Sequence, residues 1–164
     1  MVEPIKAHQL STPDPSEDPE QGYQLDQFLP YLVVKLSDSW VTRFRQELHK
    51  HGISMSRWRV LQVVCWHSGI SVNEVCRHSA IYQTSASRII DQFVSEGLMT
   101  REVSDKDGRA VVVQATEEGR ALFRKIWPLV LDMHKREVAS LTAREEQTLV
   151  KLIGKMLENG PGGT

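Results

Sequence analysis

Residues 71 to 119 contain two short helical patterns that are followed directly by two strand patterns. The first helix begins at Ser71, whose hydroxyl can accept from the backbone N–H of Glu74 while the Glu74 carboxylate reaches back to Ser71. A tight apolar turn at residues 80–81 leads into the second helix. Gly97 closes that helix, because helices often end on a residue in the left-handed conformation. The order of elements therefore predicts two packed helices and a β-hairpin.

The second of these helices has an apolar back and a polar front. The apolar residues recur at spacings of three and four, as a packed helix face requires: Ile89, Ile90, Phe93 and Val94. The front carries side chains of the kind that bind phosphates and base edges: Gln83, Thr84, Ser85, Ser87 and Arg88. One face is thus expected to pack on the domain while the other remains available to contact DNA.

The two strand runs, residues 98–104 and 110–114, flank a turn with an Asp-Gly pair, which is typical of a hairpin. Lys106 and Arg109 in this turn can reach phosphates or a minor groove, and Asp107 can hold the Arg109 guanidinium in one direction. Alone, such a hairpin is usually a solvated turn. Directly behind a polar-fronted helix, it predicts the wing of a winged helix-turn-helix that places one helix and one basic hairpin on DNA.

From Ser54 to Gly119 the sequence resembles the MarR family of bacterial transcription regulators. The matching segments follow in the family's order: Ser54–Leu61, Ser71–Val75, Thr84–Ile90, Glu96–Arg101, Asp107-Gly108-Arg109 and Thr116–Gly119. Ala115 departs from the pattern, since the family usually has leucine before that threonine. The resemblance implies a DNA-binding regulator, most often a repressor, that binds a pseudopalindromic operator as a homodimer. It also implies release from DNA by a small aromatic carboxylate or phenolic effector.

The remaining regions complete a mainly α fold with a small β-wing. A helix capped by Ser54 or Ser56 should run to His67 or Ser68, and residues 70–72 can add a short strand to the wing sheet. We expect a winged helix-turn-helix domain over 53–115. Two flanking helical regions, 25–52 and 116–158, carry broad apolar faces that need a partner surface. By resemblance, that partner is a second identical subunit. Capping residues Thr116 and Thr142 begin the later helices, and Pro128 predicts a bend.

Residues 1–24 are polar and contain prolines at positions 4, 13, 15 and 19, which predicts a flexible acidic arm rather than a packed element. This arm is either a disordered tail or, by resemblance, a segment that lies across the partner subunit. The net charge of −1 is low for a DNA-binding chain. However, residues 1–27 contain six acids and one base, so the remainder carries a charge of +4.

A candidate effector site combines tryptophans and arginines near the start of the chain. Trp40 and Arg43 are neighbours on the first helix, and Trp58 and Arg59 open the second. An arginine beside aromatic walls suits a planar anion. The alternative is that the tryptophans belong to the core and the arginines cover apolar surface with their stems.

The sequence does not favour an enzyme, a metal site or a cofactor. The six histidines form no HExxH or paired metal-ligand spacing, and no Gly-rich phosphate loop or Gly-x-Ser-x-Gly motif occurs. Cys65 lies in an apolar run and is expected to be a core residue, and two cysteines fit a reducing cytoplasm. No stretch is apolar enough for a membrane span and no signal peptide is indicated, so we expect a soluble, cytoplasmic protein.

A second class of function remains open, namely a winged-helix module that binds another protein and never meets DNA. Arg88 and Arg109 discriminate between the two classes. Exposed arginines favour DNA, whereas burial of either one in an ion pair favours the protein-interaction module.

Overall fold

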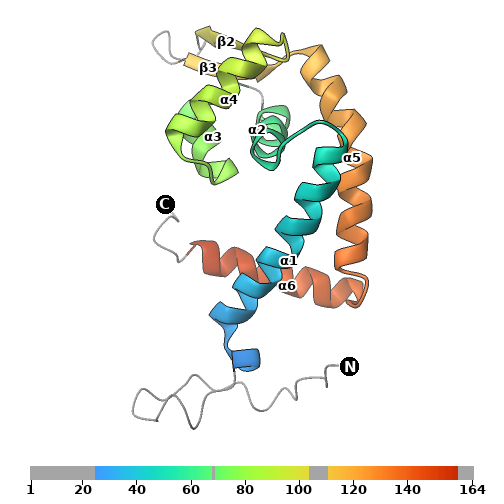
Figure 1. Ribbon diagram of the computed structural model, residues 1–164. Helices are drawn as coiled ribbons and strands as arrows, with labels where there is room; N and C mark the ends of the chain where they lie inside the picture. Colours follow the sequence, from blue (N-terminus) through green and yellow to red (C-terminus); the bar gives the residue numbers. More distant parts are fainter. Residues whose placement is uncertain (1–24, 68, 104–110, 159–164) are drawn as a thin grey trace. The chain divides into compact units, whose positions relative to one another are not determined.

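The computed structural model describes residues 25–67, 69–103 and 111–158 (Figure 1). It divides into two compact units, Met1–Glu47 and Leu48–Thr164. The described residues are mainly helical with one small antiparallel sheet, which confirms the predicted fold class. The elements are η2 (Leu25–Gln27), α1 (Leu29–Lys50), α2 (Met55–Trp66), β1 (Ile70–Ser71), α3 (Val72–Ser79), α4 (Gln83–Ser95), β2 (Met99–Val103), β3 (Val111–Ala115), α5 (Glu117–Glu137) and α6 (Ala143–Glu158).

Helix α1 starts at Leu29, a few residues inside the helical region expected over 25–52, because residues 25–27 form a separate 3-10 turn. Pro30 lies in the first turn, where a missing backbone N–H leaves no hydrogen bond unmade. At the other end Gly52 adopts a φ of +72°, and the Ile53 N–H donates to the Leu48 carbonyl at 3.2 Å. The Gly52 N–H donates to His49 in the same way, at 3.0 Å. The pair of bonds forms a Schellman motif, which satisfies carbonyls that the helix itself leaves free.

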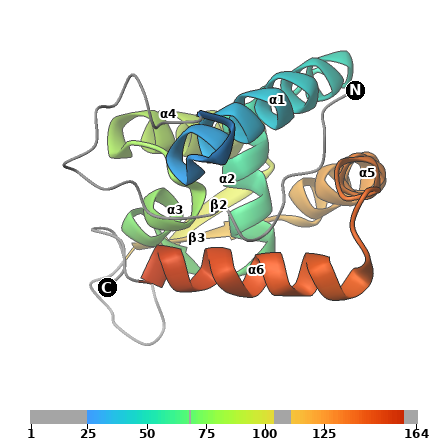
Figure 2. The same cartoon turned by 90° about the horizontal axis from the view of Figure 1, so that it is seen from below.

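Helix α2 is the centre of the second unit. The Ser54 hydroxyl caps it by accepting from the Arg57 N–H at 3.3 Å. The helix contacts α3, α4, α5 and β3, and Figure 2 shows it together with α3 beside the strands. Because neighbours lie on several sides, its buried residues are not confined to one stripe: Trp58, Val60, Leu61, Val63 and Val64. The helix ends at Trp66, slightly before the predicted end at His67 or Ser68.

The capping box of α3 is present as predicted. The Ser71 hydroxyl accepts from the Glu74 N–H at 3.3 Å, and the Glu74 carboxylate accepts from the Ser71 N–H at 3.0 Å. Hydrogen bonds from the Ser71 side chain and backbone lower the pKa of Glu74. The helix then turns sharply at Ala80, which has a left-handed backbone with φ 51° and ψ 46°.

The three-stranded sheet has the order β1-β3-β2, with both pairings antiparallel. Ile70 is opposite Val113, so residues 70–71 supply the short strand that the sequence predicts. The hairpin pairs β2 with β3, from Met99 opposite Ala115 to Val103 opposite Val111. The predicted turn between them lies outside the described residues.

Helix α5 starts where the sheet ends. The Thr116 hydroxyl accepts from the Gly119 N–H at 3.1 Å and donates to the Gly97 carbonyl at 2.8 Å, so one side chain joins the helix start to the end of α4. Gly119 is buried directly against the Leu98 backbone. The helix continues through Pro128 to Glu137. Helix α6 opens with the predicted capping box, in which the Thr142 N–H donates to Glu145 at 2.7 Å.

Candidate nucleic-acid interface

Helix α4 separates a buried back from an exposed front. Ala86, Ile90 and Phe93 are fully buried, so the back of the helix is fixed by packing. Of the five predicted contact residues on this helix, four are exposed: Gln83, Thr84, Ser85 and Arg88. Two details differ from the sequence prediction. Ala86 packs inward, and Val94, which the spacing assigned to the packed face, is 37% exposed.

Ser87, the fifth predicted contact, is half-buried and belongs to an internal link. Its hydroxyl accepts from Arg101 on β2 at 3.5 Å, and the same guanidinium forms an ion pair with Asp91 at 2.7 Å. Arg101 therefore ties the wing strand to the side of α4. Sequence reasoning missed this residue, because its partners on α4 lie 10 and 14 positions away and no short-range spacing relates them.

The far end of α4 is held by Arg57 of α2. Its guanidinium forms an ion pair with Glu96, donates a hydrogen bond to the Gln92 side-chain oxygen at 3.4 Å, and lies over the Phe93 ring, 4.1 Å from the ring centroid. Planar stacking and a charged partner together fix a guanidinium in one orientation. The helix that carries the polar front is thus anchored along its length to α2 and β2.

The turn that precedes α4 sets the positions of its first side chains. Gln83 donates to the Asn73 side chain of α3 at 3.4 Å, so this predicted base reader is linked to the neighbouring helix. Tyr82, immediately before it, is 88% exposed. No sequence pattern marks Tyr82 as a DNA contact, because a tyrosine between two helices ordinarily packs in the core. Only the structure shows that it is exposed.

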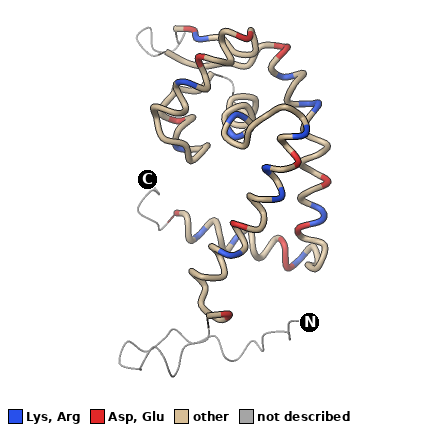
Figure 3. The backbone as a smooth tube through the Cα atoms, viewed as in Figure 1, with Lys and Arg blue, Asp and Glu red and all other residues tan. Residues whose placement is uncertain are grey.

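Charges of both signs occur on the described helices. Basic and acidic positions are interspersed along α5 (Figure 3). One of them, Arg124, is paired with Glu117 at the start of that helix. The wing residues Lys106, Asp107 and Arg109 lie outside the described residues, so their roles stay predictions. An ordinary, salt-sensitive affinity for phosphate is what this distribution favours.

A family model described as "MarR family" matches residues 51–110, which include α2, β1, α3, α4 and β2 and end before β3. A MarR family transcriptional regulator from Silicibacter pomeroyi has the same fold with a TM-score of 0.78 and 28% identity, over 84% of this chain and 94% of that one. The chain is thus similar to MarR-family regulators both in this segment and in its fold. These matches support a DNA-binding transcriptional regulator, and the matched MarR-family proteins are regulators rather than enzymes.

Two further relatives extend the comparison. The transcriptional repressor IacR of Pseudomonas putida is 22% identical over 146 residues, which span 89% of this chain and 86% of the relative. The solved structure of BpsR from Bordetella bronchiseptica, whose DNA binding is regulated by 6-hydroxynicotinic acid, has a TM-score of 0.73 and 22% identity, over 84% of this chain and 99% of that one. No helix in the described part of this chain is long and apolar enough to cross a membrane.

The four predicted effector residues differ in their surroundings. Trp58 is 1% exposed and stacks on Phe123 with the ring centroids 5.5 Å apart and the planes 1° from parallel. It is therefore a core residue, the alternative that the sequence analysis left open. Arg59 is exposed in the same unit. In the first unit, Trp40 is half-buried and Arg43 is exposed. An aromatic cluster on α2 and α5 was not foreseen.

This cluster continues outward from Trp58. The ring centroids of Phe123 and Trp127 are 5.5 Å apart, and the Trp66 ring makes edge contacts with both of these rings. Trp66 itself is 56% exposed. Phe123 and Trp127 are one helical turn apart on α5, so the spacing alone fits either a packed seam or a surface stripe. The cluster joins α2 to α5, and its three tryptophans, Trp58, Trp66 and Trp127, give a fluorescence signal that reports on that contact.

Cys65 of α2 is half-buried, and its thiol has a raised pKa. Burial raises the pKa of its thiol to about 11, although Arg120 and Arg124 act in the opposite direction. The Arg120 guanidinium also donates to the Cys65 carbonyl at 3.1 Å, which occupies a backbone acceptor in the last turn of the helix. Since the thiolate is the reactive form, Cys65 is poorly suited to sense oxidants at neutral pH.

We expect the Cys65 thiol to react slowly in the folded protein. In a Cys76→Ser variant, which leaves Cys65 as the sole thiol, labelling by a disulfide reagent at pH 8 should be at least about 100-fold slower than in urea, because a pKa near 11 leaves few thiolates. Stopped-flow absorbance measures both rates. Equal rates in the folded and unfolded states would show that the thiol is accessible and ionised.

Proposed function

We propose that this regulator binds a pseudopalindromic operator as a homodimer, acts as a repressor, and leaves DNA when a small aromatic acid binds. The observation that carries the DNA-binding part is the exposed polar front of α4 on a fully buried back. Such a helix can enter a major groove without unpacking. In a dimer, two of these helices reach successive major grooves when they lie about 34 Å apart.

The side chains on the front have different chemical capacities. Gln83 and Arg88 can each make paired hydrogen bonds to one base, adenine and guanine respectively, so we assign them to base readout. Thr84 and Ser85 lie in the first turn and are assigned to phosphate contacts, which position the protein but carry no sequence information. The wing would add Arg109 in a minor groove, with Lys106 in support and Asp107 orienting the arginine.

Exposure of Arg88 favours DNA over the alternative protein-interaction module. The experiment is selection of duplexes from a random library by the full-length protein, followed by sedimentation of the complex with the selected duplex. We expect one enriched, pseudopalindromic sequence bound by two chains. A library that stays unenriched at moderate salt would contradict operator binding and would support the protein-interaction module.

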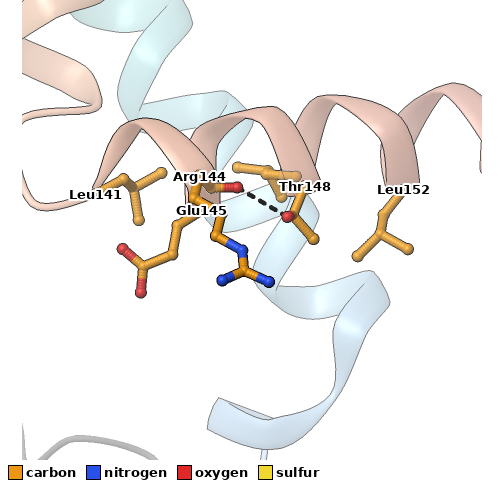
Figure 4. A pocket seen from close by; sticks show the side chains of 6 residues that line it. Leu141, Arg144, Glu145, Thr148 and Leu152 are labelled. Atoms are coloured by element: carbon orange, nitrogen blue, oxygen red, sulfur yellow. Dashed lines mark hydrogen bonds between the residues drawn. The ribbon is translucent and has the colours of Figure 1, made fainter.

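Dimerisation is proposed for regions 25–52 and 116–158 because their helices leave apolar side chains in water. On α1, Leu29, Val33 and Val34 are each about half exposed, at 53%, 49% and 58%. On α6 the exposed set is Val150, Leu152, Ile153, Met156 and Leu157. Figure 4 shows part of the α6 surface, a hollow lined by Leu141, Arg144, Glu145, Thr148, Leu149 and Leu152. Apolar surface of this extent is characteristic of a face that a partner covers.

We expect Leu152→Glu to separate the dimer. Placing a carboxylate in an apolar interface costs far more than leaving it in water, so the monomer fraction should rise and operator affinity should fall at least about tenfold. Analytical ultracentrifugation and a binding titration measure these effects. Gln147→Glu adds the same charge at another exposed position of α6 and serves as the control. A Leu152→Glu protein that stays dimeric at micromolar concentration would contradict this interface, as would a dimeric chain lacking residues 142–164.

The effector is proposed to be a planar aromatic acid, by analogy with BpsR and its 6-hydroxynicotinic acid. Arg43 and Arg59 are exposed cations that could bind a carboxylate, and Trp40 could supply an aromatic wall. Titration with 6-hydroxynicotinic acid and hydroxybenzoates, followed by tryptophan fluorescence and release of the selected duplex, tests the proposal. If Arg43→Ala and Arg59→Ala both leave the affinity of an active acid unchanged, this site is wrong while operator binding stands.

A further inference from the structure

Tyr82 is the most exposed large hydrophobic side chain in the described part of the chain. It is 88% exposed, compared with 69% for Leu157 and 65% for Val150, and those two lie on the α6 face already assigned to dimerisation. A single exposed aromatic residue on a surface ordinarily needs no explanation. The position of Tyr82 does need an explanation, because this residue comes immediately before the first residue of α4.

The tyrosine does not stabilise the helix that it precedes. It occupies the N-cap position with φ −60° and ψ 144°, and its side chain makes no capping hydrogen bond. Serine, threonine, aspartate or asparagine there would satisfy a free backbone N–H, as Ser71 does for α3 and Thr116 for α5. The fold uses only the backbone of Tyr82, whose carbonyl accepts from Ser85 at 3.0 Å and Ala86 at 2.9 Å.

The backbone around Tyr82 is nevertheless firmly held. Ala80 has a left-handed conformation, and the Ile81 N–H donates to the Cys76 carbonyl at 3.3 Å, so the turn between α3 and α4 is closed on itself. On the other side, Gln83 is bonded to Asn73. A tyrosine on such a turn has only two side-chain torsions to fix on binding, so little conformational entropy is lost when it makes a contact.

We propose that Tyr82 recognises a thymine through its C5 methyl group, beside the base contacted by Gln83. The inference rests on the operator binding proposed above. N-terminal residues of a recognition helix are the ones that meet base edges. The thymine methyl is the apolar group that the major groove presents, and an aromatic ring is a suitable surface for it. The phenol hydroxyl can at the same time donate to a phosphate oxygen, a contact that would not depend on sequence.

The test replaces thymine by deoxyuridine, which removes only the methyl group. Duplexes selected by the full-length protein are synthesised with deoxyuridine at each thymine in turn, symmetrically in both half-sites. Binding is measured for the wild-type protein and for Tyr82→Ala, Tyr82→Phe and Val94→Ala. Val94 lies in the last turn of α4, is also exposed, and provides the matched control. Thermal unfolding of each variant checks the fold, which an exposed side chain should not affect.

For the wild type we expect one symmetric thymine pair at which deoxyuridine weakens binding about fourfold per half-site, or about 15-fold for the duplex, the loss of one buried methyl group. Tyr82→Ala should bind the thymine duplex more weakly and be insensitive to deoxyuridine at that pair. Tyr82→Phe and Val94→Ala should keep the sensitivity, and a uniform loss in Tyr82→Phe would measure the hydroxyl contact.

Two results would overturn the inference alone. One is an operator whose thymine methyl groups have no effect, and the other is a methyl effect of equal size in the wild type and Tyr82→Ala. In both cases a sequence has been selected, so operator binding itself is supported. Failure of the library to enrich at all would overturn the proposed function together with this contact.

Discussion

Replacing Gly119 with alanine should destabilise the protein by about 3 kcal/mol, in the upper range for overpacking of a buried site. A Cβ atom at Gly119 would lie 2.1 Å from the Leu98 carbonyl oxygen, which is backbone and cannot rotate away. That same oxygen accepts the Thr116 N–H at 3.1 Å. The methyl group therefore forces apart the start of α5 and the segment that enters β2. These two parts are joined by hydrogen bonds from Thr116 to the Gly97 and Leu98 carbonyls.

Urea and thermal unfolding measure the effect, and a loss of about 3 kcal/mol corresponds to a midpoint lower by about 6–12 °C for a chain of this size. Gly154→Ala is the matched control, because a Cβ atom there meets nothing within 4 Å. In the interior of α6 that exchange should stabilise by up to about 1 kcal/mol through helix propensity. Equal stability of Gly119→Ala and the wild type would show that the junction between α5 and the wing is not rigid.

Local sequence patterns predicted the starts and ends of the helices well. The capping boxes at Ser71 and Thr142 need only residues three apart, and both are present in the structure. The end of α1 at Gly52 similarly depends on one left-handed residue. These features depend on residues within about one helical turn of each other, so the local sequence contains all the residues that determine them.

Features that depend on distant residues were missed. Arg101 is an ordinary charged residue in the sequence, and its role follows from its ion pair with Asp91 on α4. Gly119 reads as a helix residue, and only the structure places it against Leu98. From the sequence, Trp58 could be either a core residue or a wall of a ligand site. The contact that decides between them is with Phe123, which lies on a different helix, α5. Tertiary packing decides such cases, and a periodic pattern contains no information about which element lies opposite.

Arg88→Ala should reduce sequence discrimination more than it reduces affinity for DNA in general. Arg88 is exposed on the front of α4, one turn beyond Thr84 and Ser85. A guanidinium that makes paired hydrogen bonds to guanine contributes about 1–3 kcal/mol of discrimination, and a homodimer uses two. Its charge also attracts any phosphate, which gives a smaller loss on every sequence. Thr84→Ala should show the opposite pattern, with similar losses on all DNA.

In the proposed complex, the exposed front of α4 reads the operator. The most direct measurement is the ratio of affinities for the selected duplex and a scrambled duplex of equal length, at one fixed salt concentration, for the wild type, Arg88→Ala and Arg136→Ala. Arg136 is an exposed arginine in the last turn of α5 and is the matched loss of charge. We expect this ratio to fall at least about 30-fold in Arg88→Ala, from the loss of two contacts of about 1 kcal/mol or more each, and to stay unchanged in Arg136→Ala. An Arg88→Ala protein that keeps the wild-type ratio would contradict this role of α4.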